Sequence, residues 1–239
     1  MTQASLLPVI CDRTKPPPGL ATAAADFIAI DDVTTHRWLC KGQSKHADVP
    51  ITEWLCSKLA AECGLPVPDI GIIELRSAPG VPYFGSQWLG GARDFIDVMG
   101  RISNPGIFAR THAVDLFVHN TDRHRNNFLF LELAGDVVAR VIDFSHSLYV
   151  MGWPLPALPM SACNTTREFP ALLAQDPATY VKPQTVVDRL SALDDQWLAD
   201  ALSPVPAQWL DPTRTAALKA WWASPARQTR VADAQSCLP

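Results

Sequence analysis

The sequence lacks the features of three large protein classes. Its six cysteines form no C-x-x-C pair and no dense cluster, and no secretory signal opens the chain, so we expect reduced thiols in a cytoplasmic protein. No apolar run approaches the ~20 residues of a membrane-spanning helix. The formal net charge is −4 and the pI is near 5.8, which gives no evidence for binding nucleic acid or an anionic membrane.

A glycine-rich G-x-G-x-x-G loop is also absent. Enzymes that transfer phosphate often cover the phosphates with such a loop. Residues 15–25, where it would stand, include three consecutive prolines and predict a stiff, non-helical connector, so the phosphate-covering residues stay unassigned. With 239 residues, 48% of them hydrophobic, the chain can form one large domain or two small lobes that share a cleft.

The most informative stretch is residues 111–149. Residues 113–119 are apolar at helical spacing, and turn-forming residues then lead to Asp122. A polar loop reaches Asn127, and two apolar runs follow that predict a β-hairpin ending at Asp143. The three polar side chains would therefore stand where elements end, which is where side chains can be presented to a ligand.

This order of residues suits phosphoryl transfer from a nucleotide. Asp122 would accept the proton of an attacking hydroxyl, and Asn127 with Asp143 would hold Mg²⁺ through oxygen atoms. The spacing from Asp122 to Asn127 matches the catalytic loop of protein kinases, in which a second metal-binding Asp follows on the next hairpin. A lone D-x-x-x-x-N is weak, since the plain alternative is a solvated hairpin entry, but the three residues in this order strengthen the hypothesis.

The motifs NTDRHRNN and VIDFSHSLY resemble the HipA-like kinases, whose signature runs N-x-D-R-x-x-x-N and then I-D-[FH]-x-x-[AS]-L. A more distant similarity links them to phosphatidylinositol kinases. The resemblance implies an α+β, two-lobed, protein-kinase-like fold with ATP and Mg²⁺ between the lobes. We expect a small β-rich N-lobe over residues 1–90 and a mainly helical C-lobe over residues 91–239.

A strand over residues 37–41 ends at Lys41, and a helix over residues 51–63 follows between the capping residue Asp48 and Gly64. Taken alone, Lys41 reads as a surface lysine at a strand end.

The helix segment ITEWLCSKLAAECGLPVPD resembles the family's A-E-L-x-x-x-L-A-x-x-L-G-L-P-V-P, in which the first Glu pairs with a phosphate-binding strand lysine. The resemblance therefore assigns this pair to Lys41 and Glu53. Glu62 is the rival for the role, and Glu53 is favoured in a first helical turn in any case.

Two more strands, over residues 70–75 and 82–89, are separated by a turn at residues 77–80. Kinase hinges offer backbone groups to the adenine ring, so Gln87, Trp88 and Leu89 are candidates by position. The alternative is a strand that runs into a flexible Gly-Gly linker.

The residues beside the loop leave several readings open. Asp115 orients the loop or is a polar face position. Arg123 and Arg125 balance phosphate, balance a peptide-bound acid, or are solvated. For His119 and His124 we favour a structural, hydrogen-bonded imidazole over a group that tunes the catalytic carboxylate.

Two departures separate the chain from protein kinases: Ser145 replaces the glycine after Asp-Phe, and Asn-Thr-Asp replaces His-Arg-Asp. The sequence also shows no activation segment that ends in A-P-E. The C-terminal third matches the family only as helical. We expect one helix over residues 185–202, another over residues 212–223, and a frayed tail after Ser224.

The expected activity is Mg²⁺-dependent transfer of the γ-phosphate of ATP to a hydroxyl acceptor, most simply a protein Ser/Thr, with a regulatory partner protein possible. A nucleotide-binding pseudokinase that serves as an interaction module is the first alternative. A small-molecule phosphotransferase of the aminoglycoside type is the second, although its acceptors are often cationic and Arg123 and Arg125 flank this loop.

Overall fold

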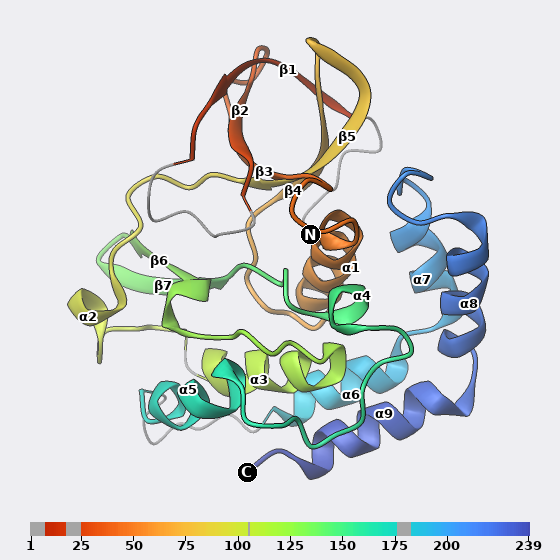
Figure 1. The fold of residues 1–239 in the computed structure, drawn as a ribbon. Helices are drawn as coiled ribbons and strands as arrows, with labels where there is room; N and C mark the ends of the chain where they lie inside the picture. Colours follow the sequence, from red (N-terminus) through yellow and green to blue (C-terminus); the bar gives the residue numbers. More distant parts are fainter. Residues whose placement is uncertain (1–7, 18–24, 105, 176–182) are drawn as a thin grey trace.

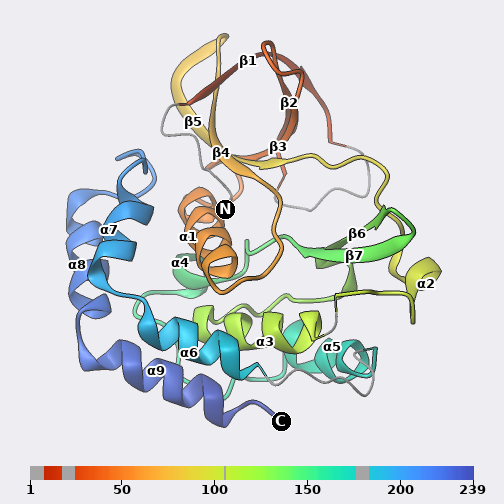
Figure 2. The ribbon, with the colours of Figure 1, turned by 180° about the vertical axis from the view of Figure 1, so that it is seen from behind.

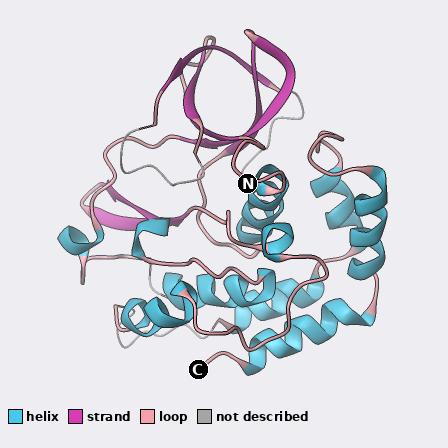
Figure 3. Ribbon diagram, viewed as in Figure 1, coloured by secondary structure: helices cyan, strands magenta, loops and turns pink. Residues whose placement is uncertain are grey.

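The structure is a computed structural model that describes residues 8–17, 25–104, 106–175 and 183–239. It is a mixed α and β fold, with a strand barrel at one end and the helices, together with a separate two-stranded sheet, at the other (Figure 3). In the described ranges, no helix combines the length and apolar character needed to cross a bilayer. The suggested phosphate-covering interval lies mostly outside these ranges.

Five strands form a closed barrel at the upper end of the molecule (Figure 1). In spatial order they are β1 (Val9–Lys15), β2 (Phe27–Asp31), β3 (Arg37–Lys41), β5 (Ala78–Gln87) and β4 (Ile70–Leu75). Strand β1 pairs antiparallel with β2 and parallel with β4, which closes the barrel. A small apolar cluster fills its interior: Cys11, Ala29, Trp38, Cys40, Ile73 and Leu75.

Two details of the barrel differ from the sequence prediction. Strand β1 was not predicted, because only its first three residues are apolar and the other four are polar and exposed. The turn between β4 and β5 consists of Arg76 and Ser77, and residues 78–80 already belong to β5. Proline and glycine in that stretch favoured a turn, but the strand passes through them as an irregularity: Ala78 pairs with Leu75 and Pro82 with Glu74, and the register shifts between these two pairs.

Helix α1 (Val49–Glu62) lies between the barrel and the helical part, and it is buried on nearly all sides. Trp54 is fully buried and donates its indole N–H to the carbonyl of Ala201, 2.8 Å away. Asp48 precedes the helix but makes no capping hydrogen bond; its carboxylate instead pairs with Arg214 at 2.7 Å. The predicted cap is therefore wrong, and the start of α1 is tied to a distant helix.

The middle of the chain forms a two-stranded sheet and the helices that lie against it. Its elements are α2 (Phe95–Val98), α3 (Ile107–Val118), a 3-10 turn (Arg125–Asn127), β6 (Phe128–Leu133) and β7 (Asp136–Val141). Helix α3 is almost wholly buried and ends at His119, whose φ of 56° lies in the left-handed region. The buried end of α3 thus feeds directly into the candidate catalytic loop.

The rest of the chain is helical: α4 (Leu148–Met151), α5 (Asn164–Leu173), α6 (Gln184–Ala192), α7 (Asp195–Leu202), α8 (Pro212–Trp222) and α9 (Pro225–Ser236). Seen from behind, α3, α6 and α9 form layers at the base, while α7 and α8 stand beside α1 (Figure 2). One apolar core connects α1, α3 and the β6–β7 sheet with these helices.

The predicted helix over residues 185–202 is two helices. The chain breaks at Leu193 and Asp194, and the Asp194 side chain accepts a hydrogen bond from the backbone N–H of Trp197 at 2.9 Å, which caps α7. Apolar residues at helical spacing on both sides of the break concealed it.

The predicted frayed tail after Ser224 is wrong, because α9 is a docked helix. Arg227 and Arg230 on α9 are buried, and they donate hydrogen bonds to carbonyl groups of α6 and of α3, respectively. Such arginines satisfy carbonyls at helix ends that would otherwise lack partners. The polar sequence of this segment did not indicate a docked helix, because sequence alone does not show whether an arginine is buried or exposed to solvent.

Candidate active site

Four side chains from three parts of the chain meet below the barrel. Lys41 ends β3, Glu53 lies in α1, and Asp143 with Ser145 follows β7. The Lys41 ammonium forms an ion pair with Glu53, lies 2.8 Å from Oδ1 of Asp143, and donates to Oγ of Ser145 at 2.9 Å. All four side chains are buried or nearly so, and Glu62 instead pairs with Arg189 near the surface.

Lys41 and Asp143 favour each other's charged forms. Burial alone would lower the pKa of Lys41, but the two carboxylates outweigh it, and the pKa is raised. Burial likewise opposes the ionised form of Asp143, yet Lys41 and the hydroxyl of Ser145 hold its pKa well below the usual range. Burial raises the pKa of Glu53, and the neighbouring Lys41 ammonium opposes that rise.

The backbone after β7 is shaped to present Asp143. Its φ of 60° lies in the left-handed region, which Asp tolerates better than most residues. The next N–H, of Phe144, donates to Oε2 of Glu53 at 3.2 Å, and Phe144 itself is fully buried. The hydroxyl of Ser145 lies 2.7 Å from both Glu53 and Asp143. Since the φ of Ser145 is not positive, this position does not require glycine.

Asp122 lies in the loop after α3, and about a third of its side chain is exposed. Its Oδ1 accepts a hydrogen bond from the amide of Asn164 on α5. Its Oδ2 lies 3.9 Å from Nε2 of His124 and 3.9 Å from Nε2 of His146. One oxygen is therefore fixed, and the other faces two imidazoles.

Asn127 is buried and ties the loop to the β6–β7 sheet. Its amide nitrogen donates to the carbonyl of Asp122 at 2.8 Å, and its own carbonyl accepts from the N–H of Ile142 at 3.1 Å. The side-chain oxygen is thereby left as the atom that can act as a ligand. The spacing from Asp122 to Asn127 thus closes a short loop that is joined to the strand leading to Asp143.

Arg123 is buried and its charge is paired with Asp115, so it is neither solvated nor free to balance a phosphate or a peptide-bound acid, and the sequence interpretation of this residue is wrong. Its guanidinium makes two hydrogen bonds to the carboxylate of Asp115, at 2.9 and 3.0 Å. It also donates to the carbonyls of Asn127 and Ile142 and lies over the ring of Phe144. Asp115 therefore orients the loop through Arg123, whereas Arg125 remains exposed.

A cleft lies between the barrel and the β6–β7 sheet, with an empty volume of about 530 Å³ that includes space open to solvent. It is lined by the candidate hinge residues Gln87, Trp88 and Leu89, by Lys41, Glu53 and Asp143, and by apolar side chains such as Leu39, Phe84 and Val141. Asp122 and Asn127 are not among the described residues that line the cleft. Asn127 is hydrogen-bonded both to Asp122 and to Ile142, and Ile142 does line the cleft.

The hinge candidates differ in their free backbone groups. The N–H of Gln87 donates to Asp69 at 2.8 Å, and that of Trp88 donates to Arg37 at 2.7 Å. The N–H of Leu89 has no partner in the part of the chain that the structure describes. Leu89 is therefore the position best suited to donate to a ligand in the cleft.

The donors fit a magnesium ion. Asp143 offers a carboxylate and Asn127 an amide oxygen, which are hard oxygen ligands. Within the described ranges, no cluster of three or more His, Cys, Asp and Glu side chains is placed to hold a metal. An ion at this site would thus complete its coordination with phosphate and water oxygens, as Mg²⁺ commonly does.

Two side chains near the loop escaped the sequence analysis. Asn164 lies 42 positions after Asp122 and beyond a proline-rich segment, so no local spacing pointed to it. Arg230 donates to carbonyls near the end of α3 and contacts His119, which makes that imidazole structural. Burial and Arg230 lower the pKa of His119 to about 4, so it stays neutral.

Neither a protein-family model nor a curated protein sequence matches the chain. Two solved structures are similar to it in fold. The Helicobacter pylori proinflammatory kinase CtkA gives a TM-score of 0.61 at 12% identity, with 95% of this chain and 95% of that chain covered. HipA of a Shewanella oneidensis MR-1 toxin–antitoxin system, in a complex with HipB and operator DNA, gives a TM-score of 0.50 at 12% identity, covering 84% of this chain and 58% of that one.

At 12% identity these likenesses concern the fold, and the roles of single residues do not follow from them. They agree with the mixed α and β fold that the resemblance implied. The chain has the fold shared by the kinase CtkA and by HipA, which confirms the predicted HipA-like resemblance at the level of the fold.

Proposed function

We propose that the protein is a HipA-like kinase that transfers the γ-phosphate of ATP to a hydroxyl group, most simply of a protein Ser or Thr. The observation that carries the proposal is the position of Lys41 between Glu53 and Asp143, at the wall of a cleft. A lysine held by one carboxylate and placed beside a second is the arrangement that kinases use for nucleotide phosphates and metal.

The roles follow from the contacts. Lys41, held by Glu53, binds the phosphates, and Asn127 with Asp143 holds Mg²⁺, which neutralises phosphate charge when bound. Asp122 positions the acceptor hydroxyl and takes its proton. The hydroxyl oxygen forms a bond to the γ-phosphorus as the bond to the β–γ bridging oxygen breaks, and ADP leaves with that electron pair.

The two-lobed arrangement belongs to the same proposal. Residues 1–90, with the barrel and α1, serve as the N-lobe, and residues 91–239 serve as the C-lobe. The adenine ring lies in the cleft against Leu39 and Phe84, and its edge accepts a hydrogen bond from the N–H of Leu89. Gln87 and Trp88 line the wall of the cleft but donate no hydrogen bond to the adenine, because their backbone N–H groups are bonded within the fold.

One observation favours the pseudokinase as a second candidate. Oδ1 of Asp143 is already engaged by Lys41 and by Ser145, so a metal must use the other oxygen or displace these partners. A protein that binds nucleotide in this state without transferring phosphate would serve as an interaction module.

Two measurements separate these candidates. A kinase binds Mg·ATP, seen as a rise in melting temperature, and transfers ³²P from γ-labelled ATP to a protein or peptide. A pseudokinase shows the first and not the second. Leu89→Pro removes the proposed hinge N–H and should weaken ATP binding at least about tenfold, the effect of losing a hydrogen bond of roughly 1.4 kcal/mol. Ala207→Pro, at an exposed turn position whose N–H makes no hydrogen bond within the described ranges, is the control.

If wild-type protein neither binds Mg·ATP nor transfers phosphate, the kinase proposal fails altogether.

A further inference from the structure

Helix α5 is anchored to the candidate catalytic loop, although the two are far apart in sequence. The buried hydroxyl of Thr165 donates to the carbonyl of Asn120 at 2.6 Å and accepts from the N–H of Arg123 at 2.9 Å. The N–H of Thr165 also reaches the carbonyl of Thr121. The first turn of α5 is therefore a fixed wall beside the candidate base.

Asn164, the first residue of α5, connects this wall to the base. Its amide nitrogen donates to Oδ1 of Asp122, and its amide oxygen accepts from the guanidinium of Arg167. Because both ends of the amide are engaged, the orientation of Asn164 is set. Oδ1 of Asp122 is thereby occupied, and Oδ2 is the oxygen left to meet an acceptor.

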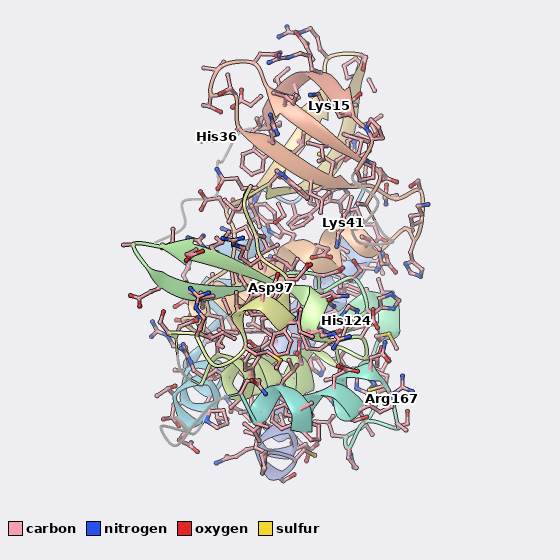
Figure 4. The ribbon with its side chains drawn as sticks, turned by 90° about the vertical axis from the view of Figure 1, so that its left-hand side faces the viewer. Lys15, His36, Lys41, Asp97, His124 and Arg167 are labelled. Carbon is pink, nitrogen blue, oxygen red and sulfur yellow. The ribbon has the colours of Figure 1, made fainter. Side chains whose placement is uncertain are left out.

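Two imidazoles and two exposed arginines surround that free oxygen or lie near it on the same part of the chain. His124 and His146 approach it at 3.9 Å from two sides. Arg125 and Arg167 are exposed, and neither forms an ion pair with a described carboxylate. Glu168 is the acidic neighbour on α5. Figure 4 shows Lys41, His124 and Arg167 one below another along the same side of the molecule.

We propose that the surface formed by Arg125, Arg167 and the free oxygen of Asp122 binds the acceptor, and that the acceptor hydroxyl belongs to a Ser or Thr in an acidic peptide segment. This inference rests on the proposed function. Asn164 is a positioning residue that turns Oδ2 of Asp122 toward the hydroxyl. Arg167 and Arg125 bind the carboxylates that flank it. A guanidinium suits this role because it can make two parallel hydrogen bonds to one carboxylate.

The charges also separate this acceptor from the small-molecule alternative. A cationic acceptor such as an aminoglycoside would meet two arginines, Arg125 and Arg167, that form no ion pair with any carboxylate of the described residues. Arg123 does not contribute to this repulsion, because it is buried and paired with Asp115. Arg167, which comes from a distant part of the chain, supplies the second positive charge beside Arg125.

The acceptor is tested with matched synthetic peptides that carry one Ser or Thr between acidic, neutral or basic flanks, using γ-³²P ATP and Mg²⁺. Wild-type protein should use the acidic peptides with a kcat/KM at least tenfold above the basic ones. Arg167→Gln should raise the KM for acidic peptides at least tenfold more than the KM for basic peptides, with the KM for ATP unchanged; a loss transmitted through Asn164 would affect both kinds of peptide and cancel in this comparison. Arg76→Gln, an exposed arginine on the barrel, is the charge-matched control.

The positioning role needs a different readout. Asn164→Ala should lower kcat at least tenfold while the KM for ATP and for the acidic peptide stay within a factor of two. Asn164→Gln, which keeps an amide, should recover part of the loss. A purely structural role would instead change the melting temperature without this separation of kcat from KM.

Several outcomes would overturn the inference. They are a wild-type preference for neutral or basic flanks, an equal loss for all peptides in Arg167→Gln, and transfer only to small molecules. Transfer to protein that ignores flanking charge would also refute it while leaving the proposed kinase intact. Absence of both Mg·ATP binding and transfer would instead refute the kinase itself.

Discussion

Arg123 and Asp115 form a buried, two-pronged ion pair that joins α3 to the candidate catalytic loop and, through the Ile142 carbonyl, to the strand before Asp143. The side chains are 4% and 0% exposed, so neither charge has access to bulk water. Burial raises the pKa of Asp115 even though Arg123 opposes it, which means that the pair is costly to bury and damaging to break.

Breaking this pair should therefore destabilise the fold. Asp115→Asn keeps the shape but leaves the Arg123 charge unpaired, and we expect a loss of about 3–5 kcal/mol in the free energy of unfolding. Urea denaturation measures it. Arg189→Gln, which removes an exposed ion pair, should change stability by less than about 1 kcal/mol. Equal effects of the two substitutions would show that the buried pair is not a structural support.

The protein should lose stability in acid partly through His112. Burial lowers its pKa from 6.5 to about 4, and its ring stacks on Phe169 with centroids 3.7 Å apart. The folded state thus prefers neutral His112, while the unfolded state takes up a proton near its ordinary pKa. The contribution is complete above pH 6.5 and falls as the pH drops toward 4, by at most about 3 kcal/mol.

His112→Gln tests this contribution, since glutamine does not titrate. The difference in unfolding free energy between wild type and the variant should shrink as the pH falls from 7 to 4. Carboxylates titrate in both proteins and cancel in that difference. A difference that stays constant over this range would contradict the assignment.

Ser145 should support the site and not merely replace a glycine. Ser145→Ala removes a hydroxyl that contacts Lys41, Glu53 and Asp143, and should cost about 1–2 kcal/mol of stability. Ser145→Gly should cost roughly a further 0.5–1 kcal/mol, because the backbone there has no need of glycine and gains freedom when unfolded. Thermal and urea unfolding of both variants decide it, and a more stable glycine variant would refute the argument.

The sequence predicted what depends on local pattern. The strand over residues 37–41 followed from its residue pattern, and the positions of Asp122, Asn127 and Asp143 at the ends of elements followed from the predicted loop and hairpin. Tertiary contacts were beyond it. Nothing local distinguishes Arg123, turned inward to Asp115, from Arg125, which is exposed.

The same limit explains the C-terminal errors and the missed neighbour of the base. Arg227 and Arg230 make α9 part of the core by binding carbonyls of other helices, which a polar sequence does not announce. Asn164 becomes relevant only when the chain brings α5 back against the loop.

The measurement that tests the central claim most directly is the rate of ³²P transfer from γ-labelled Mg·ATP by wild type and by Asp122→Asn, with ATP affinity measured for both proteins. The account predicts that the substitution lowers the transfer rate by at least about a hundredfold, the effect of losing a positioned general base, while ATP affinity changes by less than threefold. Equal transfer rates would contradict the role of Asp122. Loss of ATP affinity to the same extent as activity would contradict the separation of the acceptor side from the nucleotide cleft.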